Sequence, residues 1–137
     1  MHLCRDELAA LPLFSSVSRS ELAFIRRHLT LLPLPAGRVL MEEGARGDQF
    51  MVIAEGEASV SLGGRTIATL ERGDLVGEMA LLDEDGSGLR NATVTLTTDA
   101  MVYVGTRWEF RQILETAPSV ARKVRQTAAS RELDRAA

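Results

Sequence analysis

The chain has 137 residues, of which 45% are hydrophobic and 26% charged, so it is long enough to form one domain with a substantial core. Its formal net charge of −3 gives no indication of direct DNA binding. Cys4 is the single cysteine, which excludes an internal disulfide and a cysteine-based zinc cluster. The sequence shows neither a signal-peptide pattern nor an apolar run of membrane-spanning length. We therefore expect a cytoplasmic protein with no membrane segment.

The first thirty residues favour helices. Residues 5–11 combine acidic and apolar side chains in the pattern of a short helix, which Pro12 should stop. Ser18 and Glu21 then stand three residues apart, as in a capping box that begins a second helix. In that helix Leu22, Ile25 and Leu29 should face inward and Arg26 and Arg27 outward, with the end near Thr30.

The middle of the chain changes to the two-residue period of strands. Glycine-containing turns separate short apolar runs rich in valine and threonine, and the step from Leu62 to Arg65 through two glycines predicts a tight hairpin. The expected strands are 31–34, 39–41, 50–54, 58–62, 66–70, 92–96 and 101–104. Many short strands with such turns predict an antiparallel β-sandwich or barrel.

After Gly105 the helical period returns. Thr106 can cap a helix whose buried side should carry Trp108, Ile113 and Leu114. Pro118 interrupts it, and a second helix is expected over 119–135, with an inward stripe that contains Val120, Val124, Thr127 and Ala128. The fold class is thus mainly β with flanking helices (α+β): short N-terminal helices, a β-roll of the jelly-roll kind and two C-terminal helices.

The stretch 76–94 combines the groups that a nucleotide needs. Gly77 would open a helical turn, and the unpaired N–H groups at the start of such a turn favour an anion. Arg90 can form a bidentate charged contact with the same anion. Glu78 would instead accept a hydrogen bond from a sugar hydroxyl. An anion site beside a sugar acceptor suggests a nucleotide site.

Other kinds of site find little support in the sequence. His2 and His28 lie far apart without a further ligand at metal spacing, so we expect no metal. The segment Gly86–Gly88 is not followed by the residues of a Walker loop. Ser15 and Ser130 have no suitably placed histidine partner, so nucleophilic catalysis is not indicated. We expect neither an enzyme nor a cofactor.

These motifs together identify a resemblance that covers roughly residues 8–135. The chain resembles the cyclic nucleotide-binding domain family of catabolite-activator-like regulators, protein kinase regulatory subunits and cyclic nucleotide-gated channels. The resemblance rests on the glycine turns at Gly44–Asp48, Gly56 and Gly73–Asp74, on Gly77–Leu81 and on Arg90–Val94. It implies a single domain over 1–137, with N-terminal helices in 1–30, a β-roll in 31–106 that holds a phosphate-binding cassette at 76–94, and C-terminal lid helices in 107–137.

The resemblance also implies roles for individual residues. Glu78, with Gly77 beside it, is similar to the carboxylate that accepts the ribose 2′-hydroxyl. Met79 and Ala80 look like the turn whose N–H groups meet the cyclic phosphate, and Arg90 like the arginine that neutralises it. The remaining candidates are Asn91 and Ala92, which follow that arginine, and Arg131, which falls where a lid arginine contacts the base. For Asn91 a plain turn role, and for Arg131 a solvated helix face, stay open as alternatives.

The implied function is that of a sensor. We expect it to bind a cyclic nucleotide, with cAMP favoured over cGMP as the ligand although the residues themselves do not distinguish adenine from guanine. Occupancy would be transmitted through the C-terminal helix to an effector domain or a partner protein that contacts the terminal helices. The alternative is a degenerate domain of the same fold that acts only in protein–protein contacts. Two departures from the family pattern keep it open: Leu89 stands where proline usually precedes the arginine, and the loop 83–88 is long and acidic.

Overall fold

The computed structural model describes residues 7–77 and 92–136, and it describes the burial of side chains for residues 8–77 and 92–131. The N-terminal part contains α1 (Glu7–Ala10), the 3-10 helix η1 (Pro12–Phe14) and α2 (Arg19–His28). The strands are β1 (Thr30–Leu34), β2 (Val39–Met41), β3 (Gln49–Glu55), β4 (Ala58–Leu62), β5 (Arg65–Leu70), β6 (Leu75–Val76), β7 (Thr93–Leu96) and β8 (Ala100–Thr106). The chain closes with α4 (Arg107–Thr116) and α5 (Pro118–Ala136).

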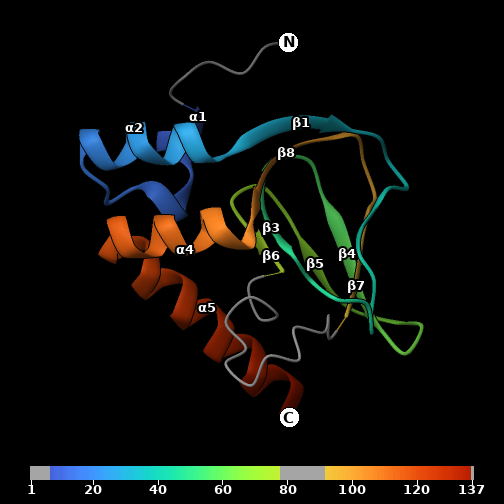
Figure 1. Ribbon diagram of the computed structural model, residues 1–137. Helices are drawn as coiled ribbons and strands as arrows, with labels where there is room; N and C mark the ends of the chain where they lie inside the picture. The colour runs from blue at the N-terminus through green and yellow to red at the C-terminus, as the bar shows by residue number, and fades with distance from the viewer. Residues whose placement is uncertain (1–6, 78–91, 137) are drawn as a thin grey trace.

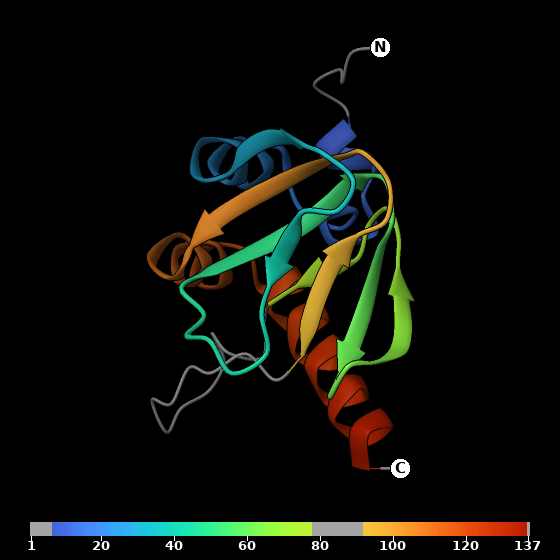
Figure 2. The same ribbon diagram turned by 90° about the vertical axis from the view of Figure 1, so that its right-hand side faces the viewer.

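The strands form two sheets that face each other. One sheet has the order β1-β8-β3-β6 and the other β2-β7-β4-β5, and all described pairings are antiparallel. The helices gather on one side of this roll, while α5 runs from α4 toward the C-terminus past the end of the roll (Figures 1 and 2). The predicted fold class, an antiparallel β-roll with flanking helices, is confirmed.

Strand β3 contributes side chains to both apolar cores of the protein. Its five central residues are all buried, because one face meets the helices and the other meets the second sheet. Phe50 and Val52 belong to the cluster under the helices, whereas Met51 and Ile53 belong to the core between the sheets. The two-residue alternation of a strand therefore divides one continuous apolar run between two cores.

Two helices begin with reciprocal capping boxes. The Ser18 hydroxyl accepts from the Glu21 N–H at 3.2 Å, and the Ser18 N–H donates to the Glu21 carboxylate at 2.8 Å. Thr106 and Glu109 repeat the arrangement at 3.2 and 2.9 Å. Each box satisfies N–H groups that the first helical turn leaves unpaired. The predicted caps at Ser18 and Thr106 are confirmed.

The prediction that Trp108 lies on the buried side of its helix was wrong. Its side chain is 62% exposed, whereas Phe110 and Ile113 are buried. Two residues along a helix correspond to a rotation of about 200°, so Trp108 and Phe110 point to opposite sides. The Trp108 ring instead lies 5.9 Å from the His28 ring of α2, centroid to centroid.

The other differences are small. The two-residue strand β6 was missed, and several predicted strands differ from the observed ones in length by one to three residues. The Leu62–Arg65 hairpin is confirmed, and both of its glycines have positive φ, at 59° and 80°. Among the described helices none combines the length and apolar character needed to cross a bilayer. Within residues 7–77 and 92–136, no three histidine, cysteine, aspartate or glutamate residues gather as a metal site.

Candidate functional site

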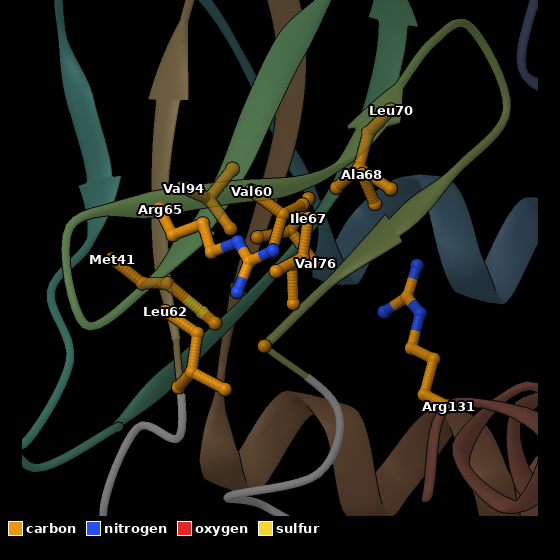
Figure 3. A pocket seen from close by; sticks show the side chains of 11 residues that line it. Met41, Val60, Leu62, Arg65, Ile67, Ala68, Leu70, Val76, Val94 and Arg131 are labelled. Atoms are coloured by element: carbon orange, nitrogen blue, oxygen red, sulfur yellow. The ribbon is translucent and has the colours of Figure 1, made fainter. Parts of the chain in front are cut away.

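A cavity of about 460 Å³ lies between the sheet β2-β7-β4-β5 and α5. Its walls come from β2, β4, β5, β6 and β7, and α5 contributes one residue from the opposite side (Figure 3). The lining residues are Met41, Val60, Leu62, Arg65, Ile67, Ala68, Leu70, Val76, Gly77, Val94 and Arg131. Its volume falls within the range of about 300–1,000 Å³ that is usual for small-molecule sites.

The register of β4 and β5 determines which of their side chains enter the cavity. Val60 pairs with Ala68 and Leu62 with Arg65, and directly paired residues share one face of a sheet. The register shifts after Val60, so that Ile67 is an additional residue in β5. This bulge keeps both pairs on the inner face. The hairpin thereby presents an apolar wall that carries one guanidinium group near its tip.

Gly77 lines the cavity and is the last residue of the described segment 7–77. It is buried, follows β6 directly and has a φ of +87°, a conformation in which a side chain would be strained. Its predicted place at the ligand site fits this position. Five other predicted site residues, Glu78, Met79, Ala80, Arg90 and Asn91, lie outside the described residues.

Ala92 and Arg131 are the remaining predicted site residues. Ala92 is fully buried in the core between the sheets, two residues before Val94, which lines the cavity. Ala92 is thus adjacent to the site in sequence but not part of its described lining. Arg131 is half-buried on α5, and its guanidinium group points toward the cavity (Figure 3). The structure brings Gly77 and Arg131 to the same cavity from opposite sides.

The described lining is mostly aliphatic, with two guanidinium groups at its borders. Arg65 extends across the strand wall, and Arg131 faces that wall from α5 (Figure 3). Such a lining suits a flat, largely apolar ring whose edge carries hydrogen-bond acceptors, because an arginine side chain only donates. Arg131 was predicted from the sequence as a site residue, whereas Arg65 and the strand wall were not. Cross-strand pairing at the Leu62–Arg65 hairpin was the signal that could have placed Arg65.

Comparison with known proteins agrees with this geometry. The family model of the cyclic nucleotide-binding domain matches residues 31–117. A cyclic nucleotide-gated potassium channel of Rhizobium etli is 33% identical over 124 residues, which are 90% of this chain and 34% of the channel. The cAMP-dependent protein kinase regulatory subunit of Aspergillus fumigatus is 35% identical over 124 residues, covering 88% of this chain and 29% of that protein.

A solved structure shares the arrangement in space. The cAMP-bound PfPKA-R fragment 141–441 superposes with a TM-score of 0.73 at 26% identity, over 80% of this chain and 38% of that one. The chain therefore spans about a third of the length of these similar proteins. The match concerns one domain of larger proteins.

Proposed function

The chain belongs to the cyclic nucleotide-binding domain family, and we propose that it is a regulatory sensor that binds cAMP in preference to cGMP. The cavity between the strand wall and Arg131 is the observation that carries this proposal. The regulatory character of the family fits this role better than catalysis does. The preference for cAMP follows the cAMP-dependent kinase subunits and the cAMP-bound structure among the similar proteins.

The ligand would extend from the cavity into the cassette 76–94, whose first two residues, Val76 and Gly77, line the cavity. In this arrangement Glu78 accepts the ribose hydroxyl, while Arg90 and the N–H groups of the turn at Met79 and Ala80 bind the cyclic phosphate. Arg131 closes the base end. The support is the position of Gly77 at the cavity, since the cassette continues directly from it. A charged hydrogen bond such as that of Arg90 contributes about 1.5–3 kcal/mol.

Transmission of the signal would use the C-terminal helices. In this model of signalling, residues 1–30 form the N-terminal helices, residues 31–106 form the roll that contains the cassette 76–94, and residues 107–137 form the lid. A nucleotide that contacts both the roll and α5 binds better when α5 lies over the cavity, so it shifts the population toward that state. A partner protein or effector domain that binds better when α5 lies over the cavity would, by linkage, tighten nucleotide binding by the same factor by which the nucleotide tightens partner binding.

Titration calorimetry with cAMP and cGMP tests the proposal. We expect binding at low micromolar concentration or better, and a loss of at least about tenfold in Arg90→Ala, because a charged phosphate contact is removed. Arg38→Ala is the charge-matched control, since Arg38 is exposed in the segment between β1 and β2 and does not line the cavity. Absence of both heat and thermal shift at millimolar nucleotide would contradict the proposal.

That negative result would favour the degenerate alternative. The acidic loop 83–88 and Leu89 in place of proline are the sequence features that support it. A simple observation separates the two readings, because a binding-competent domain purified from a bacterial host can carry nucleotide that absorbs near 260 nm. A protein-only contact module carries none and leaves its partner affinity unchanged when cyclic nucleotide is added.

A further inference from the structure

Arg65 is a charged residue on an otherwise aliphatic wall. It pairs with Leu62 across the hairpin, and its side chain therefore lies on the face that lines the cavity. Figure 3 shows its guanidinium group extended over the cavity beside Val76 and Ile67, opposite Arg131. Apart from its backbone pairing with Leu62, Arg65 has no partner among the described residues, so that its guanidinium group makes no hydrogen bond or ion pair there. Its donors are thus available to a molecule in the cavity.

The chemistry of the guanidinium group limits what it can recognise. It is permanently charged, offers five N–H donors in a planar fork and accepts nothing. A purine presents two different edges to such a fork. Guanine offers two adjacent acceptors, O6 and N7, whereas adenine offers the N7 acceptor beside an N6 amino donor. The amino group of adenine would face a donor, and the carbonyl of guanine would face its complement.

We propose that Arg65 is a specificity-determining residue that raises the affinity of this cavity for 6-oxopurine cyclic nucleotides relative to cAMP. The inference rests on the proposed function, because it assumes that the base occupies this cavity. Arg65 acts on the ratio of the two affinities whatever their order. Arg65 lies beside the glycine turn of the hairpin. The wall next to it is apolar, so its side chains do not compete with a base for the N–H donors of Arg65.

The test compares three nucleotides on the full chain: cAMP, cGMP and cIMP. Inosine has the O6 and N7 acceptors of guanine but lacks the 2-amino group, so it isolates the edge that Arg65 would read. In Arg65→Met we expect the Kd values for cGMP and cIMP to rise about tenfold, within the range of a bidentate arginine–guanine contact, and that for cAMP to change less than about twofold. Arg65→Lys keeps the charge without the fork and should lose most of the same advantage.

Control variants distinguish base specificity from a general electrostatic attraction between a positive charge and the nucleotide. Arg38→Met removes one exposed charge outside the cavity and should leave all three affinities within about twofold. Equal losses for the three nucleotides in Arg65→Met, full retention by Arg65→Lys, or no change at all would each overturn the assignment while leaving the proposed function intact. If the unmodified chain bound none of the three, the proposed function and this inference would both fall.

Discussion

The Nζ atom of Lys123 donates to the carbonyl oxygen of Pro12 at 2.8 Å, which ties the long helix α5 to the 3-10 helix η1. The same ammonium group reaches the hydroxyls of Ser15 at 3.0 Å and Ser16 at 3.4 Å. Pro12 in turn packs against the turn before β6, since a Cβ atom added at Gly73 would lie 2.9 Å from its Cδ atom. Helix η1 thus joins α5 to the strand that leads to the cavity.

We expect Lys123→Met to loosen the attachment of α5 and to reduce the stability of the fold modestly. The substitution keeps the aliphatic stem but removes the charged donor, so the free energy of unfolding should fall by about 1 kcal/mol, a value reduced by the solvent exposure of the contact. Cyclic nucleotide affinity should also fall, because α5 carries Arg131 to the cavity. Urea unfolding and calorimetry measure the two effects.

Arg122→Met is the control for the lysine substitution. Arg122 precedes Lys123 on α5, is exposed and belongs to no contact with η1 that the structure shows. It should leave both quantities nearly unchanged, as surface substitutions usually do. Equal effects of the two variants would mean that helix composition, rather than the contact with Pro12, is what matters.

The core between the two sheets predicts a contrast between two valines. Val102 on β8 is fully buried there, whereas Val39 on β2 is 45% exposed. Val102→Ala should lower the free energy of unfolding by about 2 kcal/mol, because two methyl groups leave a packed site. Val39→Ala carries the same loss of strand propensity and should cost well below 1 kcal/mol. Similar costs at both positions would contradict the burial pattern.

The sequence predicted the elements whose signals are local. Ser18, Thr106 and the two hairpin glycines each act within four residues, and the structure confirms all of them. Strand β6 has two residues, too few to show a period. The face of Trp108 depends on where the neighbouring sheet and helices lie, which its own helix does not encode.

The candidate site was partly predictable for the same reason. Gly77 was identified from its place at the start of the expected anion-binding turn and Arg131 through the family resemblance, and both line the cavity. Arg65 was not predicted as a site residue, because the direction of its side chain follows from the pairing with Leu62 and from the bulge at Ile67. The wall itself is assembled from strands far apart in the chain, so only the three-dimensional register shows which apolar residues form it.

We expect Arg131→Met to reduce cyclic nucleotide affinity less than Arg90→Ala does, by about three- to tenfold, since a base contact by a half-exposed guanidinium is weaker than a phosphate contact. It should also change the ratio of cAMP to cGMP affinity. Calorimetry with both nucleotides measures these effects. Arg125→Met, an exposed charge on the same helix away from the cavity lining, is the control. If both variants behaved alike, α5 would not contact the base.

Filling the cavity from the strand wall gives the most direct test of where the ligand binds. Ala68 faces the cavity opposite Val60, whereas its neighbour Thr69 pairs with Ser59 and points to the other face of β5. Ala68→Phe places a ring in the volume of about 460 Å³ and should reduce cyclic nucleotide affinity at least about tenfold by excluding the base. Thr69→Phe adds the same ring on the outer face and should bind normally. Thermal unfolding verifies that both variants are folded. Unimpaired binding by a folded Ala68→Phe protein would place the base outside this cavity, because the added ring and the ligand cannot share the space.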